Sequence, residues 1–332
     1  MAISIDDIKK LRAMTGAGLA DVKKALTEAE GDFDKAKELL RERGLAIAAK
    51  RSDRETSNGC VLVKCVDGFA AMIALKCETD FVANGADFIA LTQSILDAAI
   101  AAKAKDVEAV KELTLADGQK VQDAVTQRSG ITGEKMELDG YLTLEGENIE
   151  VYNHMGKNTL CTMVQTNKPA AEQGHLVAMQ VAAMKPVALD AQSIDPKILD
   201  EEYKTAVEKS KLEQVQKFVD MKLKKAGLNP NLVDSEDHIE SNMSKGWLTQ
   251  EQADEARKII ADAKVEGEAN LKMPMIEGIA KGRVEKFKKE NCLVDQEFQF
   301  GDGDKQTVAQ YLASQSKDLK ITAYKRFTLV AE

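Results

Sequence analysis

The sequence predicts an α+β protein with an N-terminal three-helix module, two α/β core subdomains with antiparallel sheets, and an inserted helical hairpin. The apolar residues change period along the chain, from helical spacing near the N-terminus to strand-like runs and back again. A strand-rich stretch followed by a helix occurs twice. Aromatic residues make up only 5% of the 332 residues and alanine is abundant, which favours helix-rich packing in two or three domains.

Residues 1–51 are expected to form three short helices. Ser4 and Asp7 have the spacing of a capping box at the start of the first helix. Thr15-Gly16-Ala17-Gly18 interrupts the helical pattern, and a third helix is expected to end near Gly44. Three helices in so short a stretch leave a small core, and such units are often recognition modules.

A linker at residues 52–58 leads into the first core subdomain, which we assign to residues 59–150. It opens with two β-like runs joined by Asp67-Gly68. This two-residue link favours a type I′ hairpin, because both of its central positions need positive φ. Later segments with helix or strand patterns are residues 87–102, 121–128, 135–138 and 141–144.

The second core subdomain combines residues 151–187 with residues 276–332. Two strand patterns precede a helix that ends before Pro186, and residues 276–289 form another helical pattern. The last apolar run, residues 321–330, needs sheet partners and is therefore expected to complete the second sheet.

Residues 188–275 are assigned to the inserted, coiled-coil-like helical hairpin. They are highly charged, with apolar residues at helical spacing, and a turn from Gly227 to Pro230 separates long helices. Thr249 and Gln252 have the spacing of a second capping box. Two interpretations stay open: a solvated surface excursion, and an arm for self-association or docking.

Composition and charge argue against several classes of function. The net charge is −9 with acidic and basic residues interspersed, so no basic face for direct nucleic-acid binding is expected. No apolar stretch approaches the roughly 20 residues of a membrane-spanning helix, and the N-terminus lacks the features of a signal peptide. The sequence therefore predicts a cytoplasmic protein without a membrane or nucleic-acid partner.

No catalytic or metal-binding constellation is recognisable. The five cysteines include no C-x-x-C pair, and the three histidines lack the i, i+4 spacing of a metal-binding helix. Cys60, Cys65 and Cys77 lie in apolar strand patterns, where we expect reduced, buried thiols. Gly16 and Gly18 do not follow a strand, which argues against a dinucleotide-binding loop. We expect no metal, no cofactor and no enzymatic activity.

Residues 78–84, Glu-Thr-Asp-Phe-Val-Ala-Asn, lie between the end of a strand pattern and the start of a helix pattern. Loops at such positions on rigid scaffolds often carry function. The spacing alone favours a plainer interpretation, in which Thr79 or Asp80 caps the helix and Phe81 belongs to the core. Both interpretations stay open at the level of residue spacing.

Motifs along nearly the whole chain resemble the elongation factor Ts family, and they occur in the family's order. Thr79-Asp80-Phe81-Val82-Ala83-Asn84 resembles the signature motif of the family. Residues 11–18, followed by residues 21–26, resemble its N-terminal module. Further matches are Gly133-Glu134-Lys135, Tyr152-Asn153-His154, residues 178–183 with Lys185-Pro186, residues 282–287, and Tyr324-Lys325-Arg326-Phe327.

The resemblance implies a UBA-like fold for the N-terminal module and a role in translation elongation. It implies that the protein is a guanine-nucleotide exchange factor, which would bind elongation factor Tu in its GDP-bound and nucleotide-free states. The alternative is a non-catalytic adaptor or assembly protein on the same fold. Both functions depend on protein–protein binding and require no covalent chemistry.

The same resemblance assigns roles to individual residues. Asp80 and Phe81 would enter the G domain of elongation factor Tu and disturb magnesium and phosphate binding. The N-terminal module would bind another helix of the G domain, and the second subdomain would contact a different domain of the partner. The chain departs from the family pattern at Leu19-Ala20, where Met-Met is common, and at Thr132, where Ile is common. The partner-binding residues implied are Arg12, Leu19, Thr79, Asp80, Phe81, Val82, Asn84, Gly133 and His154.

Overall fold

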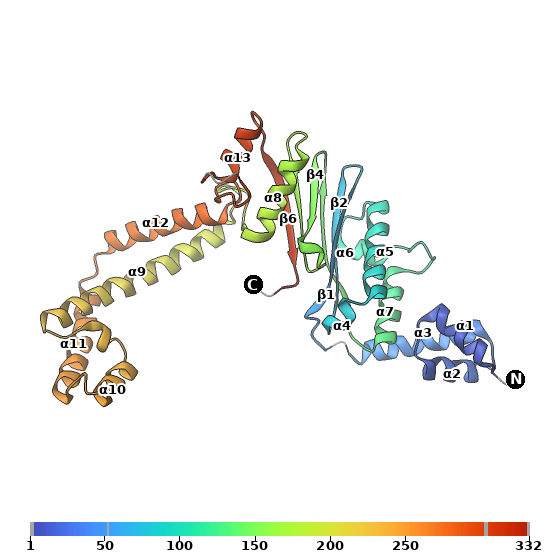
Figure 1. Cartoon of the computed structure of the whole chain (residues 1–332), viewed down its shortest axis with the longest axis horizontal. Helices are drawn as coiled ribbons and strands as arrows, with labels where there is room; N and C mark the ends of the chain where they lie inside the picture. Colours follow the sequence, from blue (N-terminus) through green and yellow to red (C-terminus); the bar gives the residue numbers. More distant parts are fainter. Residues whose placement is uncertain (1–2, 52, 302–304, 331–332) are drawn as a thin grey trace. The chain divides into compact units, whose positions relative to one another are not determined.

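The computed structural model describes residues 3–51, 53–301 and 305–330. Its contacts divide the chain into two units, one of Met1–Leu189 with Gln296–Glu332 and one of Asp190–Asp295. The helices and two antiparallel sheets (Figure 1) confirm the predicted α+β class. The first unit contains α1 (Ile5–Thr15), α2 (Leu19–Glu28), α3 (Phe33–Ala49), β1 (Asn58–Val66), β2 (Phe69–Cys77), α4 (Asp80–Ala83), α5 (Ala86–Ala102), α6 (Val107–Lys111), α7 (Val121–Thr132), β3 (Met136–Glu145), β4 (Ile149–Asn153), η1 (His154–Gly156), β5 (Leu160–Thr166), α8 (Ala171–Met184), α13 (Val308–Gln315) and β6 (Ile321–Thr328).

The N-terminal module consists of α1, α2 and α3 around a small apolar core. The capping box predicted at Ser4 and Asp7 is confirmed, since the side chain of each residue bonds the backbone amide of the other. The expected end of the third helix near Gly44 is wrong, because α3 continues to Ala49. Gly44 is buried where α3 crosses α7, and its closest neighbour there is the backbone of Gly130. A glycine inside a helix is therefore explained here by a close helix crossing.

The first sheet has the strand order β1-β2-β3. The predicted hairpin is confirmed, since Asp67 and Gly68 join β1 to β2 with φ angles of 47° and 74°. The two strand segments expected at residues 135–138 and 141–144 form a single strand, β3, with a register shift opposite Ala74 and Leu75. Gly140 follows this irregularity, and a Cβ there would lie 2.5 Å from the ring of Phe327.

The second sheet has the order β4-β5-β6. The final strand therefore completes this sheet, as predicted, by pairing antiparallel with β5. Two buried glutamine side chains connect α8 to the segment that precedes α13. Gln180 of α8 donates a hydrogen bond to the carbonyl of Glu297 at 3.1 Å. Gln296 donates one to the carbonyl of Met184, the last residue of α8, at 3.1 Å.

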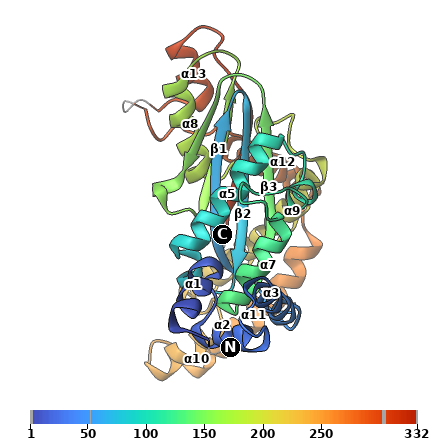
Figure 2. The same cartoon turned by 90° about the vertical axis from the view of Figure 1, so that its right-hand side faces the viewer.

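The two sheets pack face to face, and helices cover their outer faces (Figures 1 and 2). The alternation of side chains along β2 shows the layers. Ile73 and Leu75 pack with α5, α6 and α7, whereas Met72 and Ala74 pack against the second sheet. The other face of the second sheet is covered by α8. This buried double sheet forms the scaffold on which the exposed loops are held.

The second unit is helical and has its own apolar core. The capping box predicted at Thr249 and Gln252 is confirmed at the start of α11. The boundary expected at residue 275 falls inside α12, and this helix packs along α9, where Arg283 pairs with Glu213 at 2.5 Å. Self-association through this unit stays a prediction. The unit contains α9 (Pro196–Lys225), η2 (Pro230–Leu232), α10 (Glu236–Ser244), α11 (Gln250–Ala269) and α12 (Met273–Asn291).

The described residues contain neither a candidate membrane span nor a candidate metal cluster. None of their helices combines the length and apolarity needed to cross a membrane. No group of three or more His, Cys, Asp or Glu side chains among them could hold a metal ion.

All five cysteines are free, and four of them are buried. Burial raises the pKa of Cys60 to about 11 and that of Cys161 to about 12. Cys65 was expected to be buried but is only half-buried, although burial still raises its pKa. The thiolate is the reactive form.

We expect iodoacetamide at about pH 8 to label Cys65 first, because it is the most accessible of the five thiols. The other four should be labelled only when the protein unfolds. Peptide mass spectrometry of timed samples measures the order, and a Cys65→Ser variant should lack the fast reaction. Early labelling of Cys161, which packs between the two sheets, would contradict a closed pair of sheets.

Candidate partner-binding site

A one-turn helix, α4, connects the end of β2 to α5; residues 79–84 are called the α4 loop below. Thr79 is the N-cap of α4, as expected from the spacing, because its hydroxyl accepts a hydrogen bond from the Val82 amide at 3.4 Å. The same hydroxyl donates to Glu134 Oε1 at 2.6 Å, and the Thr79 amide donates to Glu134 Oε2 at 3.1 Å. The start of the loop is therefore tied to a second segment of the core.

Phe81 is the most exposed large apolar side chain among the described residues, with 86% of its surface accessible. Its assignment to the core, which spacing alone favours, is therefore wrong. Ala83 is buried and Val82 packs against the same apolar cluster, so the inward side of the turn is occupied by these two residues. The Asn84 side chain donates to the carbonyl of Asp80 at 2.8 Å and closes the turn.

Asp80 stands beside Phe81 on the exposed side of α4. Among the described residues we find no hydrogen-bond or ion-pair partner for its carboxylate. The loop thus presents an aromatic ring and a negative charge next to each other. Such a pair can displace apolar side chains of a partner and can repel or replace an anionic ligand held by that partner.

The turn after α7 forms hydrogen bonds with the start of the α4 loop. Gly133 ends α7 with a φ of 71°, a conformation that favours glycine, and it places Glu134 next to Thr79. The following amide, of Lys135, donates to Glu78 Oε1 at 2.6 Å. Glu78 also pairs with Arg54 at 2.8 Å. The structure therefore brings Gly133 to the α4 loop, as a supporting residue.

Glu78 and Glu134 were not among the residues that the sequence assigned to the site. Glu134 belongs to a motif that resembles the family and Glu78 directly precedes another, yet only their contacts reveal their role. Each connects the α4 loop to a segment more than 50 residues away, since Thr79 and Glu134 are 55 apart in sequence and Glu78 and Lys135 are 57 apart.

Hydrogen bonds hold the Glu78 carboxylate in its ionised form. The Lys135 amide is the main cause, and Arg54 adds to it, so the pKa of Glu78 lies below its ordinary value of 4.5. In the unfolded chain the group has its ordinary pKa. The stability that its charge contributes is therefore present above about pH 4.5 and is lost as the pH falls through the lower, folded-state pKa.

Glu78→Gln is expected to lower the free energy of unfolding by about 1 kcal/mol at pH 7, because the amide keeps an acceptor for Lys135 but loses the charge that faces Arg54. The difference from the parent protein should shrink below about pH 4. Urea unfolding at both pH values measures it. Glu108→Gln, which alters an exposed pair with Lys111, is the control and should have little effect.

Arg12 and Leu19 lie in the N-terminal module. Arg12 is exposed on α1, and Leu19, the first residue of α2, is 57% exposed. Met14, between them in sequence, is 55% exposed and was not predicted. The structure therefore leaves a second set of exposed apolar side chains on this module.

His154 opens the turn that follows β4. Its Nδ1 lies 3.2 Å from the hydroxyl of Tyr152, and the rings of these two residues meet edge to face. Tyr152 makes a similar contact with His175 of α8. The neighbouring Met155, which the sequence did not single out, is 70% exposed with a φ of 54°. His154 is thus positioned by Tyr152, and Met155 is the exposed apolar residue of the turn.

The His154 turn and the α4 loop lie at the same end of the paired sheets. Asn58 at the start of β1 pairs with Cys77 at the end of β2, directly before the α4 loop. The amide of Val61, three residues into β1, donates to the carbonyl of Asn158 at 2.7 Å. Asn158 belongs to the segment that follows His154. The chain thus presents two exposed loops at one end of its core.

The chain is similar to known proteins along its entire length. The family model described as elongation factor TS matches residues 78–331. Elongation factor Ts of Bacteroides fragilis is 57% identical and that of Parabacteroides distasonis 56% identical, each over 100% of both chains. Elongation factor Ts of Porphyromonas gingivalis is 41% identical over the same coverage. These matches include the α4 loop and the segments that support it, and the chain belongs to the elongation factor Ts family.

Proposed function

We propose that the protein is a guanine-nucleotide exchange factor that binds elongation factor Tu and promotes GDP release. In this proposal Asp80 and Phe81 enter the G domain of the partner and disturb its binding of magnesium and phosphate. The observation that carries the proposal is the 86% exposure of Phe81 at the tip of a loop tied down by Glu134. Membership of the elongation factor Ts family supports a role in translation elongation.

The anchoring of the α4 loop suits a side chain that must enter another protein. Thr79 and Glu134 form two hydrogen bonds, and Asn84 closes the turn, so the backbone carrying Phe81 is ordered before binding. A preorganised loop loses less conformational entropy on binding than a flexible one. More of the free energy gained by burying the ring is then available to displace elements of the partner.

The energy required exceeds what one aromatic ring can supply. Accelerating GDP release about 10⁴-fold requires roughly 5.5 kcal/mol of differential binding. Burying one phenylalanine contributes about 1.5–3 kcal/mol. Further contacts are therefore needed, and the exposed apolar residues Leu19, Met14 and Met155 are the candidates, together with Arg12 and His154. An interface of well over about 1,000 Å² is expected.

Coupling between the two ligands of the partner explains how such a factor is recycled. If binding of this protein weakens the binding of GDP by some factor, GDP must weaken the binding of this protein by the same factor. The protein would therefore bind nucleotide-free elongation factor Tu more tightly than the GDP-bound form. Rebinding of a nucleotide would then release it.

Stopped-flow release of fluorescent GDP from the cognate elongation factor Tu tests the proposal. A stoichiometric amount of this protein should accelerate release by orders of magnitude, and excess unlabelled GDP should reduce its affinity for the partner. Unchanged release despite complex formation would instead support an adaptor or assembly role on the same fold.

A further inference from the structure

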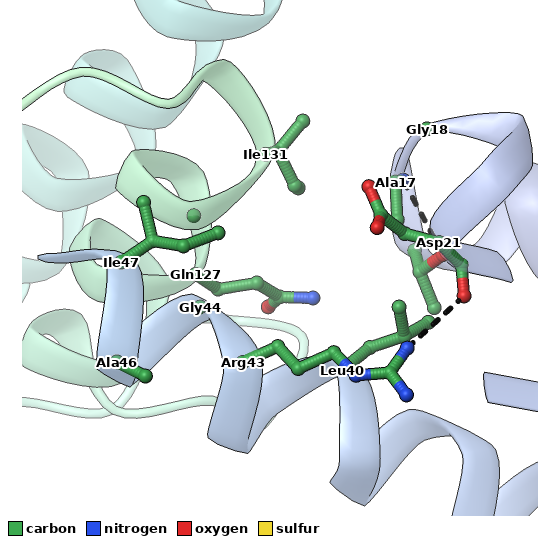
Figure 3. Close-up of a pocket in the computed structure, with 12 residues that line it drawn as sticks. Ala17, Gly18, Asp21, Leu40, Arg43, Gly44, Ala46, Ile47, Gln127 and Ile131 are labelled. Atoms are coloured by element: carbon green, nitrogen blue, oxygen red, sulfur yellow. Dashed lines mark hydrogen bonds between the residues drawn. The ribbon is translucent and has the colours of Figure 1, made fainter. Parts of the chain in front are cut away.

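A pocket of about 230 Å³ lies between the N-terminal module and the core (Figure 3). Its walls are mostly apolar and come from both sides. Ala17 and Leu40 belong to the module, Ile47 to the last turns of α3, and Ile131 to α7 of the core. An apolar cavity of about 150 Å³ can bind benzene, so this pocket has room for a larger ring.

Two charged side chains stand at the pocket, and they are not equivalent. Arg43 forms an ion pair with Glu28 and donates to the backbone carbonyl of Asp21 at 3.4 Å, so its charge is already compensated. The carboxylate of Asp21 points toward the pocket (Figure 3). Within the described parts of the chain it has no hydrogen-bond or ion-pair partner. The pocket therefore presents the negatively charged carboxylate of Asp21 beside apolar walls.

We propose that this pocket binds a small organic cation with an apolar, ring-sized body and a protonated amine. The body would fill the space between Leu40 and Ile131, and the amine would pair with Asp21. The amide of Gln127, on the core side of the pocket, offers one further polar contact. Apolar walls with a few convergent polar groups are the usual composition of small-molecule sites.

An occupant of this site would contact the module and the core at once. Helices α3 and α7 cross closely next to this pocket, because the residues at the crossing are Gly44 and Gly130. A ligand bridging Ala17 and Ile131 would therefore stabilise one orientation of the module relative to α7. This inference concerns residues other than Asp80 and Phe81 and does not depend on the proposed exchange function.

Three ligands with the same ring test the charge preference on the full-length protein: tryptamine, the neutral tryptophol and the anionic indole-3-acetate. Isothermal titration calorimetry should give a dissociation constant below about 1 mM for tryptamine. Tryptophol should bind roughly three- to tenfold more weakly, because one partly exposed ion pair is lost. Indole-3-acetate should bind no better than tryptophol.

Variants and a local probe assign the binding to this pocket. Asp21→Asn, on α2, should reduce tryptamine affinity to that of tryptophol. Asp34→Asn, which removes an exposed carboxylate of α3 that does not line the pocket, should not. Ala46→Phe places a ring at an exposed lining position and should abolish binding. Methyl NMR of ¹³C-labelled isoleucine should show shifts at Ile47 and Ile131.

Four results would overturn the proposal. The first is the absence of tryptamine binding at about 1 mM. The second is equal binding of the cation and the anion, and the third is an affinity that Asp21→Asn leaves unchanged. Methyl shifts confined to isoleucines outside the pocket would overturn it as well.

Discussion

Replacing Phe81 by alanine is expected to slow the stimulated release of GDP from elongation factor Tu by roughly ten- to a hundredfold. The ring is 86% exposed in the free protein and would be buried in the complex, so its removal costs the complex about 1.5–3 kcal/mol. The same exposure means that the free protein loses almost nothing. Stopped-flow exchange at fixed protein concentrations and a thermal unfolding curve measure the two effects separately.

A matched control for this variant is Val66→Ala, another exposed apolar residue of the first unit. Val66 is 38% exposed and lies at the hairpin end of β1, opposite the end that carries the α4 loop. It should leave exchange unchanged. Near-normal exchange by Phe81→Ala would show that this ring does not disturb the nucleotide site of the partner, while leaving an exchange function to the other contacts. A large fall in the unfolding temperature would show instead that Phe81 packs within the protein.

Signals within a few residues predicted much of the fold. The hairpin at Asp67-Gly68 and the capping boxes at Ser4 and Thr249 depend only on local backbone geometry, and all three are present. The final strand was predicted because an apolar run of its kind needs partners, and β6 does pair with β5. The hairpin and the capping boxes are readable because the residues that determine them are neighbours in sequence.

Contacts between distant segments account for the features that the sequence did not show. The end of α3 was placed at Gly44 because glycine usually weakens a helix, but here its small size allows the crossing with α7. The exposure of Phe81 also depends on how the α4 loop packs against the rest of the core. Spacing cannot distinguish an inward from an outward position in a single helical turn, and Val82 and Ala83 occupy the inward side.

The candidate site was therefore predicted by resemblance more than by pattern. The ordered motifs pointed to Asp80 and Phe81, and the structure adds the exposure that such a role requires. It also adds Glu134 and Glu78, whose contacts hold the loop. Arg12, Leu19 and His154 lie on separate exposed segments, and their common role in partner binding stays a prediction.

The crossing of α3 and α7 is asymmetric, and this gives the second large expected effect. A Cβ on Gly130 would lie closer than 3.0 Å to the Cα of Gly44, a backbone atom that can give way only if the two helices move apart. A Cβ on Gly44 would lie 3.6 Å from the Cα of Gly130, an ordinary contact. The same substitution therefore has opposite consequences on the two helices.

Gly130→Ala is expected to lower the free energy of unfolding by about 1–3 kcal/mol, because α3 and α7 must separate to accept the methyl group. Gly44→Ala should be neutral or stabilise the protein by up to about 1 kcal/mol, since alanine favours a helix over glycine and the space exists. Urea unfolding followed by circular dichroism measures both. Equal destabilisation by the two variants would mean that the helices do not cross as described, and the N-terminal module would then be held to the core by other contacts.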